Sequence, residues 1–239
     1  MQHPIVFIHG SGDNARVWRY QLDHFGPERA FAIDLPGHGQ RPDTLPADAS
    51  VLDYAQAVHT ILQEELHVQR PVIAGQSLGG AIALMMGIEY GSELGGLVLI
   101  GTGARLRVRA DLLEGAKNAP SETTRQLKEL AVAPANTTTV PAQIIQEQSG
   151  GNGNMLYRDL AACNVFDCMP RLHEIQIPTL IICGTDDRLT PIKYSQYLHE
   201  HIPGSMLQII PNAGHYVMRE QPEAVNEAID QWLSRLDSR

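Results

Sequence analysis

The hydrophobic positions of this chain form short, nearly continuous apolar runs that alternate with longer segments of helical spacing. Continuous apolar runs are typical of parallel strands, because helices cover both faces of a parallel sheet. The alternation predicts an α/β fold of three layers, in which a mostly or wholly parallel sheet of about six strands lies between helices. The predicted strands are Pro4–Ile8, Phe31–Ile33, Val72–Ala74, Leu97–Ile100, Thr179–Cys183 and Met206–Ile210.

The segments between these runs have the spacing of amphipathic helices. Ser50 and Asp53 are spaced as a capping box, which predicts the start of a helix that extends to about Leu66. The predicted helices are Ala15–Phe25, Val51–Leu66, Leu78–Tyr90, Ile192–His201 and Pro222–Leu236.

The alternation of strand and helix stops after Gly103 and resumes near Thr179. Residues 104–170 have a helical pattern with breaks at three prolines and at a glycine-rich hinge. This change of pattern predicts a helical cap, 104–170, inserted into a core made of residues 1–103 and 171–239. The breaks are at Pro120, Pro134, Pro141 and residues 150–153.

The stretch Pro71–Tyr90 contains the pattern Gly-x-Ser-x-Gly, centred on Ser77, between a predicted strand and a predicted helix. Glycines at 75 and 79 leave room where a β-carbon would collide with the neighbouring strand or helix. The Ser77 hydroxyl is then held at the carboxyl end of the strand. The N–H of Leu78 begins a helix, where negative charge is favoured. This geometry predicts a nucleophile.

A serine nucleophile needs a base, and histidine has a pKa of about 6.5, which suits that role near neutral pH. Among the ten histidines, His215 is the candidate, because it lies in a glycine-containing loop after the predicted strand Met206–Ile210, where the loop can bend the ring over the sheet edge. The base needs a buried acceptor that fixes its tautomer. Asp186 and Asp187, just past the strand Thr179–Cys183, are both candidates, and one of the two could be a turn residue.

Together these motifs resemble the α/β-hydrolase family. The matching motifs are His9-Gly10, the Ser77 turn, Gly184-x-x-Asp187-x-x-x-Pro191 and Gly214-His215, in the family order Ser, Asp, His. The resemblance implies that Asp187 is the acid, and that the backbone N–H groups of Ser11 and Leu78 form the oxyanion hole. It also implies structural roles for His9 and His38.

Members of that family usually carry two further strands ahead of the His-Gly strand. We therefore expect a sheet that lacks the usual first two strands. Its edge would expose a strand that is normally covered, which favours a homo-oligomer.

The resemblance is to small serine carboxylesterases with a helical cap. We expect an ester with an apolar acyl group as substrate, and Gln76, Leu189 and Tyr216 as candidate pocket residues. Apolar residues of the cap would cover the pocket, although most of them are explained more simply as the cap's own core. These residues are Leu106, Val108, Leu112, Leu113, Leu127, Leu130, Ile144 and Ile145.

Other chemistries share this constellation in relatives, including lactone opening, thioester hydrolysis, carbon–carbon bond hydrolysis, perhydrolysis and a menaquinone-pathway lyase. Arg105, Arg107 and Arg109 would suit the phosphates of an acyl-CoA thioester, or they form a solvated face. A receptor that binds a small hydrophobic molecule without turnover is the alternative outside the enzymes.

Composition and residue spacing limit the classes of ligand and partner that this chain could bind. The net charge of -9 and the lack of a basic run argue against a nucleic-acid surface. The three cysteines and the glycines lack metal-site and phosphate-loop spacing, so we expect no metal and no cofactor. The first residues lack a basic leader, and no segment approaches the roughly 20 apolar residues of a membrane span. We expect a soluble, cytoplasmic protein.

Overall fold

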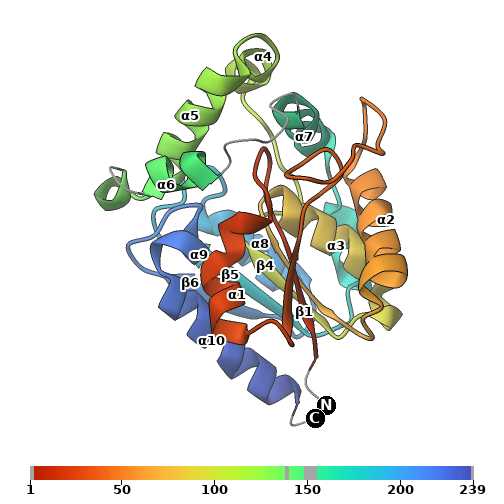
Figure 1. Cartoon of the computed structure of the whole chain (residues 1–239). Coiled ribbons are helices and arrows are strands. Elements are labelled where there is room, and N and C mark those ends of the chain that lie inside the picture. The colour runs from red at the N-terminus through yellow and green to blue at the C-terminus, as the bar shows by residue number, and fades with distance from the viewer. Residues whose placement is uncertain (1–2, 138–139, 148–154, 238–239) are drawn as a thin grey trace.

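A six-stranded, all-parallel sheet forms the centre of the computed structural model, with the strand order β2-β1-β3-β4-β5-β6 (Figure 1). The structure describes residues 3–137, 140–147 and 155–237. The predicted α/β fold with a wholly parallel sheet is confirmed. The strands are β1 Ile5–Ile8, β2 Ala30–Ile33, β3 Val72–Gln76, β4 Gly96–Ile100, β5 Thr179–Gly184 and β6 Met206–Ile210.

Helices cover both faces of the sheet, so every residue of β1, β3, β4 and β5 is buried. On one face pack α2 (Val51–Ile61), α3 (Leu78–Tyr90) and α8 (Ile192–His201). On the other face pack α1 (Arg19–Phe25), α9 (Val217–Glu220) and α10 (Pro222–Leu236). Each face has its own hydrophobic core, and the sheet separates the two (Figure 1).

The helix boundaries follow the predicted signals closely. Ser50 and Asp53 form the predicted capping box at the start of α2. The predicted helix Ala15–Phe25 begins as a 3-10 turn before α1, and α2 continues into a π turn, Leu62–Leu66. The short helix α9 was not among the predicted helices. None of the helices in the described ranges is long and apolar enough to cross a membrane.

Between β4 and β5 the chain leaves the sheet and forms four described helices beyond the carboxyl ends of the strands (Figure 1). Pro120 begins α5 and Pro141 is the second residue of α6, positions where a missing N–H costs no hydrogen bond. The predicted hinge at 150–153 lies outside the described residues, and the division into core and cap remains a prediction. The helices are α4 Ala110–Asn118, α5 Pro120–Ala131, α6 Val140–Glu147 and α7 Met155–Val165.

The register of the sheet brings the ends of the strands to one edge. Ile8 pairs with Gly75, Gln76 with Ile100, and Ile100 with Ile182. The loops that follow β1, β3, β4 and β5 therefore leave the sheet side by side, beneath the helices of the 104–170 segment. Ligands of open parallel sheets bind at this edge.

Candidate active site

Ser77 lies on the sharp turn between β3 and α3, with φ of 55° and ψ of -115°. This conformation is strained for any residue other than glycine and costs roughly 1–3 kcal/mol. Three hydrogen bonds hold it: Ser77 N–H donates to Ile100 O, and Ser77 O accepts from the Thr102 hydroxyl and from Ala81 N–H. Ser77 is half-buried, although its neighbours on both sides are fully buried.

The two glycines of the motif are required by close packing. A β-carbon at Gly75 would lie 2.0 Å from the carbonyl oxygen of Gly79, in the helix that follows. A β-carbon at Gly79 would lie 2.2 Å from the carbonyl oxygen of Ile8, in the neighbouring strand. Each distance is far below van der Waals contact, so a larger residue at either position would displace the turn.

His215 and Asp187 meet at the end of β5 and form a direct hydrogen bond. His215 Nδ1–H donates to Asp187 Oδ2 at 2.9 Å, and both side chains are buried. Nδ1 therefore carries the proton, which leaves Nε2 as the free base when the ring is neutral. Ser77 lines the same cavity as His215, but no hydrogen bond joins the two side chains. Such bonds are often longer in the absence of substrate.

Both carboxylate oxygens of Asp187 accept hydrogen bonds. Its Oδ1 accepts from the backbone N–H groups of Leu189 and Thr190, and its Oδ2 accepts from the Thr190 hydroxyl and from His215. Burial alone would raise the pKa of Asp187, but His215 and the Thr190 hydrogen bonds hold it below its ordinary value. Asp186, the other sequence candidate, bonds to Thr185 instead of His215.

The loop after β1 runs against the Ser77 turn. A β-carbon at Gly10 would lie 3.2 Å from the Ser77 β-carbon. The N–H of Leu78 begins α3, where no preceding helical turn supplies an acceptor. Ser11 lines the same cavity as Ser77, and no acceptor for the Ser11 N–H is found among the described residues. Both predicted oxyanion donors are therefore near the serine.

A cavity of about 300 Å³ lies over Ser77 and His215, between the sheet edge and the 104–170 segment. This volume is in the range of small-molecule sites. The candidate pocket residues Gln76, Leu189 and Tyr216 all line it. Its apolar wall comes mainly from the 104–170 segment, although Leu113, Ile144 and Ile145 do not contribute. That wall comprises Leu106, Val108, Leu112, Leu127, Leu130, Leu156 and Leu160.

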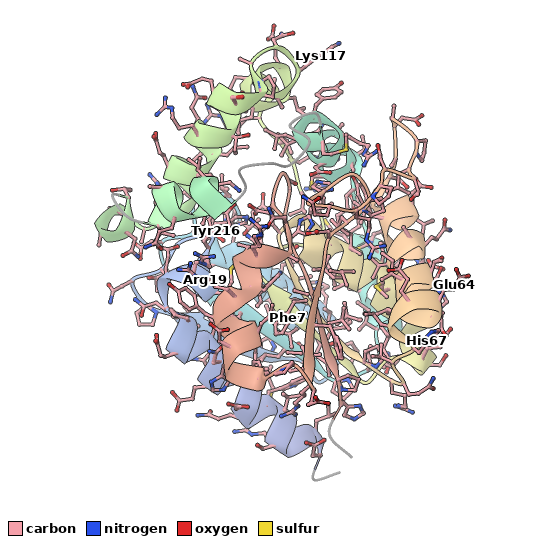
Figure 2. The ribbon with its side chains drawn as sticks, viewed as in Figure 1. Phe7, Arg19, Glu64, His67, Lys117 and Tyr216 are labelled. Atoms are coloured by element: carbon pink, nitrogen blue, oxygen red, sulfur yellow. The ribbon has the colours of Figure 1, made fainter. Side chains whose placement is uncertain are left out.

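Two of the predicted pocket residues form hydrogen bonds with other residues of the chain. Gln76 Nε2 donates to the backbone oxygen of His215 at 3.1 Å, so it holds the loop that carries His215. The Tyr216 hydroxyl donates to Asp13 Oδ2 at 2.8 Å, and Lys128 of α5 donates to both of these residues. Figure 2 shows Tyr216 where the sheet meets α5 and α6. Burial, followed by the Asp13 charge, raises the pKa of Tyr216 far above its ordinary value.

A second buried network joins α7 to the loop after β1. Asp159 is fully buried, and its Oδ2 accepts from the backbone N–H of Gly12 and from His38 Nε2, both at 2.8 Å. Its Oδ1 accepts from the Tyr54 hydroxyl at 2.6 Å. The carboxylate therefore fixes the residue next to Ser11. Burial would raise the pKa of Asp159, but the His38 charge and these hydrogen bonds lower it.

The pKa values of the two histidines of this network are shifted in opposite directions. His9 Nε2 accepts from Leu35 N–H, so its proton is on Nδ1, which donates to Gly10 O. Burial and the His38 charge lower the pKa of His9 to about 4. Burial would also lower the pKa of His38, but Asp159 and the Pro36 carbonyl raise it. Neither ring lines the cavity.

The sequence prediction missed four residues that hold the site: Asp13, Lys128, Asp159 and Glu220. Glu220 Oε1 accepts from Gly214 N–H, and Oε2 accepts from Ala133 N–H, so it joins the His215 loop to the end of α5. No short motif marks these residues, because most of their partners lie far away along the chain. The one available signal was the presence of charged residues, such as Lys128 and Asp159, in predicted helical segments.

Comparison with known proteins places this geometry in context. A model of the alpha/beta hydrolase family matches residues 5–228. A 2-hydroxy-6-oxo-6-phenylhexa-2,4-dienoate hydrolase from Burkholderia cepacia is 26% identical over 96% of this chain and 87% of its own length. A solved thermophilic esterase is 34% identical, with a TM-score of 0.82, over 98% of this chain and 91% of its own. A solved N-acyl homoserine lactone degrading enzyme is 27% identical, with a TM-score of 0.84, over 97% and 93%.

Proposed function

Because the chain belongs to the alpha/beta hydrolase family, we propose that it is a serine hydrolase that cleaves carboxylic esters. The observation that carries the proposal is the buried hydrogen bond between His215 and Asp187. His215 lines the same cavity as Ser77, whose backbone is strained. A base oriented in this way next to a serine on such a turn is the arrangement that acyl transfer requires.

In the proposed reaction the Ser77 Oγ attacks the acyl carbon of the ester while His215 Nε2 takes the Ser77 proton. Collapse of the tetrahedral intermediate breaks the bond to the alcohol oxygen, and His215 returns the proton to that oxygen. Water, deprotonated by His215, then attacks the acyl carbon. The bond to Ser77 Oγ breaks, His215 returns the proton to Ser77, and the acid is released. Asp187 remains ionised and stabilises the imidazolium, which agrees with its lowered pKa.

The negative charge that forms on the acyl oxygen would be bound by the N–H groups of Ser11 and Leu78. Removing one such donor typically costs roughly 100- to 1000-fold in rate. The apolar wall of the cavity would take the acyl chain. Because that wall belongs to the 104–170 segment, we propose that this segment acts as a cap that sets acyl preference.

The known proteins favour ester hydrolysis without excluding neighbouring chemistries. The 34% identical structure is named as an esterase, whereas the 27% identical structure is named for lactone degradation. The curated relative is named as the hydrolase of a dienoate. We rank simple esters first because they make the fewest demands on the pocket.

The test is hydrolysis of 4-nitrophenyl esters of increasing acyl length by the wild type and by Ser77→Ala. We expect turnover by the wild type, a chain-length optimum that matches the cavity, and a loss of nearly all activity in Ser77→Ala. Equal activity in both proteins would contradict the proposal. If both proteins are inert on esters, lactones and thioesters are the next substrates to assay. Saturable ligand binding without turnover of any of these substrates would favour a receptor.

A further inference from the structure

The cavity lining has a charge opposite to that of the whole chain. The chain has 27 acidic and 18 basic residues. Among the described residues that line the cavity, one is acidic, Asp13, and four are basic. The basic residues are Arg107, Arg109, Lys128 and Arg188. The excess of positive charge at this one place indicates recognition of negative charge rather than a generally charged surface.

Two of the four cations are neutralised by carboxylates. Lys128 donates to Asp13, with both side chains buried. Arg109 forms a two-pronged contact with Asp111. Arg107 and Arg188 differ, since within the described residues each donates only to backbone carbonyls. These two guanidiniums carry the uncompensated charge of the lining.

Each of the two guanidiniums is fixed at the end of a helix of the 104–170 segment. Arg107 Nη1 donates to Asn164 O near the end of α7. Arg188 Nη2 donates to Glu129 O and Val132 O at the end of α5. Carbonyls at a helix C-terminus attract a cation, so a capping role explains these contacts. These hydrogen bonds use one nitrogen of each guanidinium group, and the side chains of Arg107 and Arg188 remain exposed.

A guanidinium that is fixed but not neutralised is prepared to bind an oxyanion. It offers a rigid set of donors that matches carboxylate and phosphate, and it loses little freedom on binding. Arg188 directly follows Asp187, so a group bound there would lie near the proposed reaction centre. Arg107 lines the same cavity from the first part of the 104–170 segment.

We propose that Arg107 and Arg188 bind a carboxylate or phosphate group of the substrate, so that the preferred ester is an anionic one. This inference rests on the proposed function, because it places the ester bond at Ser77. The apolar wall takes the hydrocarbon part of the substrate, and the two arginines take its charged end. Since exposed charges are screened by salt, the preference for anionic esters decreases as ionic strength rises.

Two matched pairs of substrates test the proposal by kcat/KM. In the carboxylate pair, 4-nitrophenyl hydrogen glutarate is compared with the uncharged 4-nitrophenyl hexanoate. In the phosphate pair, butyryl-CoA is compared with the N-acetylcysteamine thioester of butyrate. We expect the wild type to prefer the anionic member of at least one pair by about tenfold. The pair that shows the preference identifies the source of the anion.

The variants assign that preference to residues. Arg107→Gln and Arg188→Gln together should abolish the preference and leave turnover of the uncharged esters within about twofold. Arg105→Gln is the matched control, because Arg105 is exposed, pairs with Asp167 and does not line the cavity. No preference in the wild type, or a preference that survives both substitutions, would overturn the proposal.

A binding measurement separates this inference from the proposed function. Calorimetric titration of Ser77→Ala with methyl hydrogen adipate and with dimethyl adipate compares ligands that differ by one methyl group and one charge. Tighter binding of the monoester, lost with the two arginines, supports the anion site even if no ester is turned over. Equal binding of both ligands contradicts it, whatever the wild type hydrolyses.

Discussion

At the scale of single residues, the proposed triad depends on how completely Asp187 is satisfied. Four hydrogen bonds hold its two oxygens, and only one of them goes to His215. The other three come from the loop that carries Asp187 itself, so this loop orients the carboxylate independently of His215. Within the described residues, the side chain of the neighbouring Asp186 accepts a hydrogen bond from the Thr185 hydroxyl and has no comparable set of donors.

Asp187→Asn should therefore keep the loop folded and remove the charge that stabilises the imidazolium. We expect kcat on a 4-nitrophenyl ester to fall roughly 1,000- to 10,000-fold. Asp186→Asn is the matched control and should retain kcat within about twofold. Steady-state kinetics with melting temperatures for both variants decides this, and a similar loss in both would reject Asp187 as the acid.

His38 and Asp159 form a buried pair whose contribution to stability depends on pH. The raised pKa of His38 means that its contribution is complete below about pH 6.5 and is lost as the pH rises through that raised value. The lowered pKa of Asp159 means that its contribution is complete above about pH 4 and is lost as the pH falls through that lowered value. The pair therefore stabilises most between these limits.

His38→Gln should lower the free energy of unfolding by roughly 3 kcal/mol near pH 6, because it leaves Asp159 buried without its charged partner. The difference from wild type should shrink at alkaline pH. Urea unfolding at a series of pH values measures it. His24→Gln, in an exposed pair with Asp230, should have little effect at any pH, and a pH-independent loss in His38→Gln would contradict the charged pair.

At the scale of elements, two helices of the 104–170 segment hold the loop that carries Ser11. Lys128 of α5 binds Asp13, and Asp159 of α7 binds the N–H of Gly12. The loop is therefore held on the C-terminal side of Ser11 by two separate helices. Cys163 of α7 also contacts Ser11, with 3.7 Å between Sγ and Oγ.

We expect Asp159→Asn to lower kcat by about tenfold with KM within about twofold, because a misplaced Ser11 N–H affects the transition state more than substrate binding. Tyr54→Phe is the control: it removes one hydrogen bond to Asp159 and leaves the Gly12 contact in place. Kinetics and melting temperatures for both variants separate the effects. A loss of stability with unchanged kcat would make Asp159 purely structural.

At the scale of the whole molecule, the sheet connects two cores that share no side chains. Ile82 of α3 is buried on one face and Ile229 of α10 on the other. Buried contacts from Lys128 and Asp159 tie the 104–170 segment to the same sheet edge. We expect these links to make the chain unfold as one cooperative unit. The exposed edge at β2 and the predicted self-association remain predictions.

Ile82→Ala and Ile229→Ala should each lower the free energy of unfolding by about 2–5 kcal/mol, with unchanged dependence on denaturant. Leu52→Ala, at a 36% exposed position, should change it by less than about 0.5 kcal/mol. Urea titrations followed by tryptophan fluorescence and by circular dichroism should coincide. Two separate transitions would show that the 104–170 segment unfolds independently.

The sequence alone determined the elements, because their signals are local. Apolar runs marked all six strands, Ser50 and Asp53 marked the start of α2, and the parallel sheet and the family membership are confirmed. The glycines around Ser77 predicted the strained turn, because only a short segment of chain decides it. Spacing along the chain was sufficient wherever the interacting residues are neighbours in sequence.

Only the tertiary structure decided what surrounds the serine. The choice between Asp186 and Asp187 needed the family resemblance, and the hydrogen bond to His215 appears only when β5 and the loop after β6 are side by side. The contacts of Asp13 with Lys128 and of Asp159 with Gly12 join residues more than a hundred positions apart. The distinction between Arg105 and Arg107 depends on which side chain faces the cavity. Such contacts follow from packing, which no local pattern encodes.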